Sequence, residues 1–217
     1  GQFKTSYRAD QQIFPIAQDR VAIFAVLVLA FVVVPMLATD YVFQAMLIPF
    51  VIMALGALGL NILVGYCGQI SLGTGAFMAV GAYAAFNLQA RFDGMPLLLA
   101  LLGGGLIAMV FGMVFGLPSL RIRGLYLAVA TLAAQFFMDW LTSRAAWVTN
   151  HSSSGSVSAG QLSIAGWQID TPMEKYLLCL AILCLIALAA KNLVRSAIGR
   201  EWMAIRDMDV AAAVIGI

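Results

Sequence analysis

Four polar side chains that could bind a ligand lie close together in one stretch of an otherwise apolar chain. Between Asn61 and Gly75 there are four glycines and four polar side chains, Asn61, Gln69, Ser71 and Thr74. Irregular backbone at membrane depth is tolerated only where it is buried in protein or lines a wet cavity. The four side chains are therefore candidates for a substrate pathway, as in the broken helices of transporters. The alternative is a glycine-rich turn without substrate contact, between two closely packed helices.

A second group of candidate residues follows the last apolar segment. The stretch from Arg200 to Ile215 favours helix and carries charges of both signs beside apolar residues. Such a helix can lie in the membrane interface or dock onto a groove of a soluble partner. Mixed charge disfavours binding to anionic lipid, so we favour docking. The residues assigned to this contact are Arg200, Trp202, Ile205, Arg206, Asp207 and Asp209.

The other reactive side chains do not form a catalytic or metal-binding pattern. His151 is the only histidine, and the three cysteines lack the spacing of metal ligands. The chain has neither a glycine loop with lysine for phosphate nor a nucleophile with its base. Asp139 is the one acidic residue inside a predicted span, but Trp140 beside it indicates the membrane interface. We therefore expect no enzyme activity, no metal and no cofactor bound by this chain.

The composition shows which elements must position these residues. Of 217 residues, 63% are hydrophobic and 10% charged, against roughly 45–50% and 25% in soluble domains. Hydrophobic runs of about 20 residues predict membrane-spanning helices, and their continuity argues against a β-barrel. We predict an all-α polytopic membrane bundle of about six spans. These are Val21–Ala38, Tyr41–Val64, Ile70–Leu88, Leu97–Leu117, Leu125–Leu141 and Tyr176–Ala190.

The positive charges predict the orientation of the spans. Nine Lys and Arg fall in segments on one side and three on the other, which places the N-terminus in the cytoplasm. A net charge of +2 gives no basic field for nucleic acid. Arg121 and Arg123 lie in a cytoplasmic loop, as a solvated anchor or as a contact with a partner or lipid phosphate.

The same distribution divides the chain into three parts. Residues 1–20 form a cytoplasmic segment, residues 21–190 the membrane domain and residues 191–217 a cytoplasmic coupling segment. Within the membrane domain, residues 142–175 form an outer loop. Its serines and glycines between Ser152 and Gly160 predict irregular structure.

Three segments resemble the permease of branched-chain amino acid ABC importers, and more closely the M-type of its two homologous permeases. They are Asn61–Gly81, Gly116–Thr131 and Gly199–Gly216. In the last segment, Asp209, Ala211, Ala212 and Gly216 occupy the places of an E-x-A-A-x-x-x-G core, and Asp in place of Glu keeps the charge. The resemblance implies that this segment docks onto an ATPase.

The resemblance also implies the partners and the location. Such permeases work in the bacterial inner membrane with a second homologous permease, two cytoplasmic ATP-binding subunits that hydrolyse ATP, and a periplasmic substrate-binding protein. The family continues with further spans, so the chain would be part of a longer protein. The loop Thr149–Gly155 departs from the glycine-rich form expected there. Relatives that move urea, amides or aromatic acids therefore remain alternatives, as does a stand-alone secondary transporter.

Overall fold

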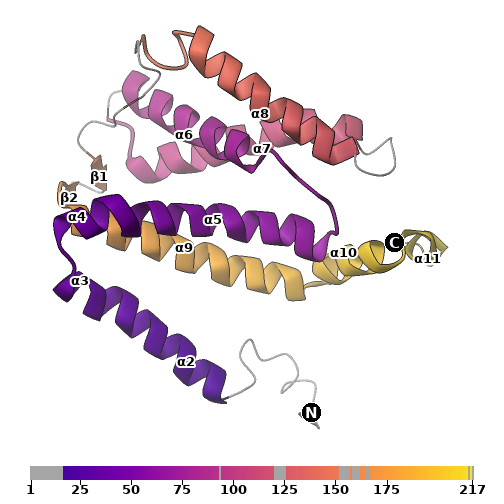
Figure 1. Cartoon of the computed structure of the whole chain (residues 1–217), viewed down its shortest axis with the longest axis horizontal. Helices are drawn as coiled ribbons and strands as arrows, with labels where there is room; N and C mark the ends of the chain where they lie inside the picture. Colours follow the sequence, from indigo (N-terminus) through magenta and orange to yellow (C-terminus); the bar gives the residue numbers. More distant parts are fainter. Residues whose placement is uncertain are drawn as a thin grey trace. The chain divides into compact units, whose positions relative to one another are not determined.

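The computed structural model describes residues 17–92, 94–119, 126–151, 157, 162–164, 167–214 and 216. The chain divides into two compact units, each built from segments that are distant in sequence. Unit 1 consists of Gly1–Leu55 and Thr171–Glu201, and unit 2 of Gly56–Asp170 and Trp202–Ile217. Figure 1 labels the elements of both units.

Two long helical rods form the first part of the chain, and each contains wide π-helical turns. The first consists of α2 (Ala17–Val28), η1 (Leu29–Val33) and α3 (Val34–Leu37). The second consists of α4 (Asp40–Val42), η2 (Phe43–Leu47), α5 (Ile48–Asn61) and η3 (Ile62–Tyr66). Pro35 and Pro49 lie two residues after η1 and η2. Because proline has no N–H and its ring clashes with an earlier carbonyl, a wider turn accommodates it.

Unit 1 is completed by α9 (Pro172–Arg195), which begins with a capping box. Thr171 Oγ1 accepts a hydrogen bond from Glu174 N, and Glu174 Oε2 accepts one from Thr171 N. Tyr176 packs its ring against Phe43 with 5.4 Å between the centroids, and its hydroxyl donates to Ala30 O at 3.1 Å. These contacts hold α9 against the two rods, with Val51 and Leu180 in the same core.

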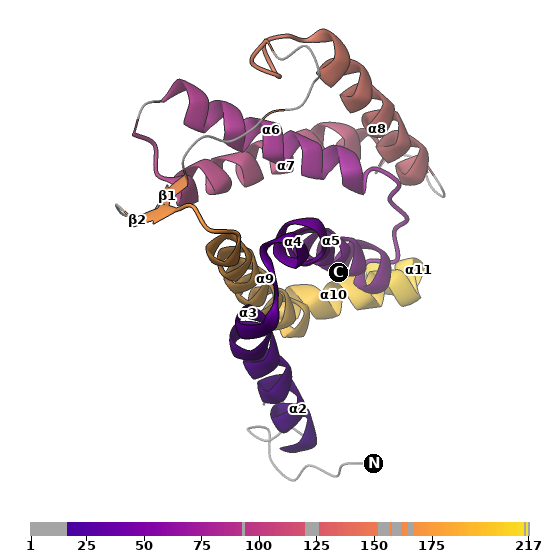
Figure 2. The same ribbon diagram turned by 60° about the vertical axis from the view of Figure 1, so that its left-hand side comes forward.

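Besides the end of the second rod and the segment from Trp202, unit 2 contains a group of three helices and a small hairpin. The helix α6 (Thr74–Arg91) packs against both α7 (Leu97–Ser119) and α8 (Tyr126–Arg144) (Figures 1 and 2). Its core contains Ala76, Val80 and Met138. The strands β1 (Leu162–Ile164) and β2 (Trp167–Ile169) pair antiparallel. The chain then continues through α9 into α10 (Ala197–Asp207) and α11 (Asp209–Val214).

The structure confirms an all-α polytopic membrane fold, because helices make up most of each predicted span. Among the described residues, four helices are long and apolar enough to cross a membrane. They are Gln18–Leu37, Asp40–Tyr66, Leu97–Leu117 and Pro172–Arg195. The helices α6 and α8 lie outside this set because polar side chains such as Asn87 and Gln135 lower their hydropathy.

One local prediction differs from the structure. The segment from Arg200 to Ile215 is expected to form one helix, but a non-helical residue, Met208, separates α10 from α11. The predicted outer loop also contains the β1–β2 hairpin, which follows the serine- and glycine-rich stretch predicted to be irregular. Arg121 and Arg123 lie outside the described residues, as do Ser152–Gly155 and Gly160.

Candidate functional site

The predicted broken segment is present between α5 and α6. The second rod ends with η3 at Tyr66, α6 begins at Thr74, and the residues between them, 67–73, are not helical. Gly68 has a φ of +69°, a left-handed conformation that residues with a Cβ rarely adopt. We call residues 67–73 the break. It turns the chain between the end of one long rod and the start of the next helix.

Two side chains of α8 hold the break and the start of α6. Thr131 Oγ1 accepts a hydrogen bond from Leu72 N at 3.0 Å, and Gln135 Oε1 accepts one from Ala76 N at 2.8 Å. The first N–H groups of a helix have no partner within it, so they need acceptors from elsewhere. Thr131 and Gln135 are four residues apart and therefore lie on one face of α8. The neighbouring helix thus supplies the cap of α6.

The backbones of α6 and α8 also approach closely at this point. A Cβ on Gly73 would lie 2.5 Å from Thr131 O, and a Cβ on Gly75 would lie 3.0 Å from Gln135 Oε1. The first distance is shorter than any van der Waals contact allows, so position 73 has no room for a side chain. The small residues therefore permit the two side-chain caps to reach the backbone of the break.

Arg206 of α10 contacts the chain at the other end of the break. Its Nη1 donates a hydrogen bond to Gly65 O at 2.6 Å, and its stem lies on Gly68, where a Cβ would be 2.5 Å from Arg206 Cγ. Asp207 Oδ1 accepts a hydrogen bond from Arg206 Nε at 2.8 Å, and Arg206 Nη2 lies 2.8 Å from the same oxygen. We call the contact with Gly65 and Gly68 the Arg206 contact. It joins two places that the sequence had singled out separately.

The four residues predicted for a substrate pathway differ in their surroundings. Asn61 and Gln69 are exposed, whereas Thr74 is half-buried at the start of α6. Ser71 is buried, and its Oγ accepts a hydrogen bond from Gly73 N at 3.4 Å. Two of the four side chains are therefore accessible, and the hydroxyl of Ser71 helps to shape the break.

The residues predicted to contact an ATPase lie on or beside α10. Trp202 is half-buried and Ile205 is 44% exposed. Arg200 Nη1 donates a hydrogen bond to Arg195 O at 3.1 Å. Asp209 is the first residue of α11, and its side chain lies outside the part of the chain that the structure describes. Large apolar side chains are exposed along the segment: Ile205, Met208, Val210 and Val214. The segment thus presents apolar surface beside charges of both signs.

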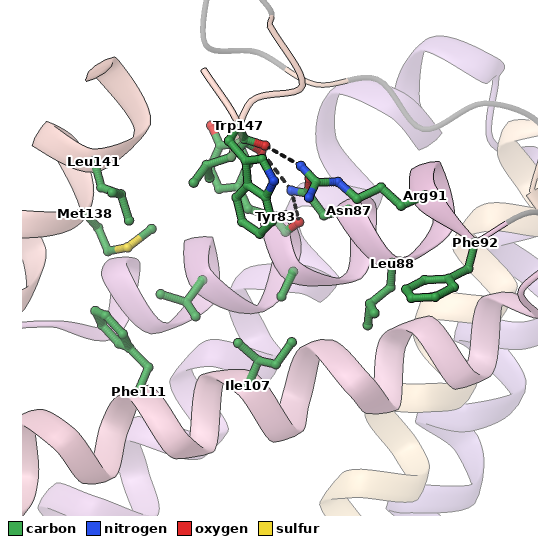
Figure 3. Close-up of a pocket in the computed structure, with 13 residues that line it drawn as sticks. Tyr83, Asn87, Leu88, Arg91, Phe92, Ile107, Phe111, Met138, Leu141 and Trp147 are labelled. Carbon is green, nitrogen blue, oxygen red and sulfur yellow. Dashed lines mark hydrogen bonds between the residues drawn. The ribbon is translucent and has the colours of Figure 1, made fainter. Parts of the chain in front are cut away.

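A cavity in unit 2 was not expected from the sequence. It has a volume of about 460 Å³ between α6, α7 and α8, and its lining is predominantly apolar. Asn87 Nδ2 donates to Tyr83 O and to Val148 O, both at 2.8 Å. Arg91 Nη2 donates to Trp147 O at 2.7 Å, and its guanidinium carbon lies 3.8 Å above the Trp147 ring (Figure 3). These bonds attach the chain after α8 to α6.

Sequence reasoning missed the residues that hold these structures. Thr131 and Gln135 on α8, and Asn87 and Arg91 on α6, are two polar pairs spaced four residues apart in largely apolar helices. That spacing places each pair on one helix face and was the available signal. Neither Leu72 N nor Gly65 O could have been identified as a partner, because backbone groups leave no mark in a sequence.

The described residues contain no cluster of three or more His, Cys, Asp or Glu that could hold a metal ion. Cys67, the first residue of the break, lies after the Asp40–Tyr66 helix, and burial raises the pKa of its thiol. A raised pKa keeps the thiol protonated at neutral pH, which makes it a poor nucleophile and a poor metal ligand. The polar groups of the break therefore suit hydrogen bonding rather than covalent chemistry.

Comparison with known proteins identifies relatives of the chain. Residues 42–217 match the family described as "Branched-chain amino acid transport system / permease component". The "High-affinity branched-chain amino acid transport system permease protein LivM" of Escherichia coli (strain K12) is 29% identical over 182 residues. The protein of the same name from Salmonella typhimurium (strain LT2) has the same identity. Each alignment covers 74% of this chain and 43% of the relative, so the chain spans less than half of their length. No solved structure gives a significant match.

Proposed function

Because the chain belongs to the permease family of branched-chain amino acid transport systems, we propose that it forms part of an importer's transmembrane permease subunit. The importer is driven by ATP and carries branched-chain or related amino acids. The chain itself binds no cofactor and hydrolyses no ATP. Two cytoplasmic ATP-binding subunits supply the energy, and a second homologous permease completes the pathway. A periplasmic binding protein delivers the substrate to the bacterial inner membrane, where the N-terminus of this chain faces the cytoplasm.

The observation that carries this proposal is the Arg206 contact. Arg206 lies on α10, whose charged and apolar exposed surface suits docking onto a soluble partner. The same side chain donates to Gly65 O and covers Gly68. Motion of a docked ATPase therefore reaches the break through one side chain. A hydrogen bond from a guanidinium group to a carbonyl oxygen is stronger than one between neutral groups, and its geometry is well defined.

The movement continues from the break into the helices. Leu72 N and Ala76 N are held by Thr131 and Gln135 of α8, so displacement of the break moves the start of α6 against α8. In our proposal Asn61, Gln69 and Thr74 line the pathway, together with Ser71 where its hydroxyl is released from Gly73 N. Alternating access follows from the shift of these helices relative to the second permease.

The proposal is tested on the full-length protein in mild detergent and in proteoliposomes. We expect ATP-binding subunits to co-purify with it, and we expect ATP-dependent uptake of leucine. A secondary transporter would purify without ATPases and would need an ion gradient instead. Uptake of urea, short amides or aromatic acids, with no uptake of leucine, would reassign the substrate within the same family.

The coupling role is tested with the double variant Arg206→Ala and Asp207→Ala. We expect ATP hydrolysis to continue while uptake per ATP falls, with normal insertion into the membrane. Glu201→Ala is the matched control, because Glu201 is an exposed charged residue of the same helix that is not among the residues assigned to the ATPase contact. Normal uptake by the double variant, or an equal loss in the control, would remove the basis for coupling through the break.

A further inference from the structure

The cavity in unit 2 has a cation at one end and an apolar interior. Arg91 is the last residue of α6 and is exposed. Among the residues that the structure describes, its guanidinium donates one hydrogen bond, to Trp147 O, and forms no ion pair. Since arginine has five N–H donors, four remain for a ligand. The Trp147 ring stacks on the guanidinium and fixes it beside the apolar lining residues, as Figure 3 shows.

The apolar part of the cavity extends far along the helices. On α6 the lining runs from Arg91 to Val80, which are eleven positions apart, and on α7 it includes Ile107 and Phe111. At 1.5 Å per residue, the span on α6 is about 16 Å. That is roughly half of a hydrocarbon core about 30 Å thick, or the depth of one leaflet. On α7, a helix able to cross the membrane, Ile107 lies ten residues from the start, at a similar depth.

We infer that this cavity binds a membrane phospholipid, with the anionic phosphate on Arg91 and an acyl chain between α6, α7 and α8. A basic side chain and tryptophan at a helix end are typical of the membrane interface and of lipid phosphate contacts. The apolar walls and a volume of about 460 Å³ provide space for a chain that reaches into the leaflet. The inference goes beyond the proposed function, because it holds for any transported substrate.

The polar groups of the cavity argue against an amino acid as the occupant. An amino acid needs an acceptor for its ammonium group as well as a donor for its carboxylate. The candidate acceptor, Asn87 Oδ1, has no hydrogen-bond partner in the described structure, but this oxygen is buried and not accessible to solvent. The amide nitrogen of Asn87 is already bonded to Tyr83 O and Val148 O. The described lining contains no carboxylate, so a zwitterion would place its ammonium group without a counter-charge among largely apolar walls.

The test is lipid binding by the full-length protein, purified with any subunits that accompany it. Delipidated protein is titrated with dioleoyl-phosphatidylglycerol, and bound lipid is counted by native mass spectrometry. We expect Arg91→Gln to weaken the tightest lipid about fivefold, the effect of one cationic contact near 1 kcal/mol. Arg144→Gln is the matched control, since Arg144 is an exposed arginine in the last turn of α8 that does not line the cavity.

A second pair of variants tests the apolar part. Ala84 lines the cavity, whereas Ala90 on the same helix is exposed and does not. Ala84→Leu should lower lipid occupancy and Ala90→Leu should not, with both proteins checked for folding by gel filtration. Release of the lipid by millimolar leucine or by inorganic phosphate would show a small-molecule site and overturn the inference. Equal losses in Arg91→Gln and Arg144→Gln would overturn it too, because they indicate nonspecific surface attraction.

Discussion

Replacement of Gly68 by alanine tests the Arg206 contact through the backbone that receives it. Gly68 has φ +69° and Gly94 has φ +80°, so a Cβ is strained at both positions. For an L-residue in the left-handed region the cost is about 1–2 kcal/mol. The two sites differ in their surroundings. A Cβ on Gly68 would lie 2.5 Å from Arg206 Cγ, whereas a Cβ on Gly94 has no atom within 4 Å.

The difference between the two alanine variants isolates Arg206. The stem of Arg206 must move by about 1 Å to restore van der Waals contact, which takes Nη1 away from Gly65 O. A hydrogen bond from a charged donor contributes about 1.5–3 kcal/mol. Because the Arg206 side chain is 38% exposed, water replaces part of this bond. We therefore expect Gly68→Ala to be about 1 kcal/mol less stable than Gly94→Ala, a difference below the full range for a charged donor.

The assay is thermal unfolding of the purified complex, together with the ratio of uptake to ATP hydrolysis in proteoliposomes. Gly68→Ala should lower both the Tm and the ratio, and Gly94→Ala should lower the Tm alone. In an Arg206→Ala background, the excess loss in Gly68→Ala should shrink, as expected for two groups in contact. Equal effects of the two glycine variants, or an excess that persists without Arg206, would refute the reasoning.

Three further predictions concern other contacts of the described structure. Thr131→Val leaves Leu72 N without its acceptor and should reduce stability by about 1–3 kcal/mol; Thr142→Val is the control, because Thr142 Oγ1 bonds only to carbonyls of its own helix. Asn87→Ala removes the bond to Val148 O and should speed limited proteolysis after α8; unchanged cleavage would contradict that attachment. Burial raises the pKa of Cys67, so maleimide labelling of this thiol, in a Cys179→Ala and Cys184→Ala background, should be slow at pH 7. The labelling rate should increase at a higher pH than it does for an exposed thiol. Gly68→Ala should accelerate the labelling.

The helices of this fold could be predicted because a membrane-spanning helix is a long, continuous run of apolar residues, which is visible in the sequence. The break could be predicted as well, since Gly65, Gly68 and Gly73 interrupt an apolar pattern with polar neighbours. The capping by Thr131 and Gln135 could not, because it links side chains to backbone groups about 59 residues away. Contacts between residues that are distant in sequence produce no periodic pattern of residue types, so they cannot be recognised in the sequence.

The tail shows the same limit from another direction. Mixed charge and apolar residues predicted a docking helix, and α10 forms as expected. The sequence did not indicate that Arg206 reaches Gly65 O across 141 residues, or that the helix ends before Met208. Helix propensity favours continuation through Met208 and this residue is 70% exposed, so neither its propensity nor its burial explains where α10 stops. In the sequence Arg91 is one of the three positive charges on the outer side, whereas in the structure its stacking on Trp147 gives it a defined place.

The wide turn η3 gives the region before the break a further property. A π-helical turn contains about one residue more than an α-helical turn. If Ile62–Tyr66 tightened to α-helix, the end of the rod at Tyr66 and the start of the break would rotate by about 100° and advance by roughly 1.5 Å. Gly65 O lies within this turn, so tightening would swing that oxygen away from Arg206 without breaking the rod. The extra residue of this turn thus allows the end of the rod to rotate when the helix is displaced slightly along its axis.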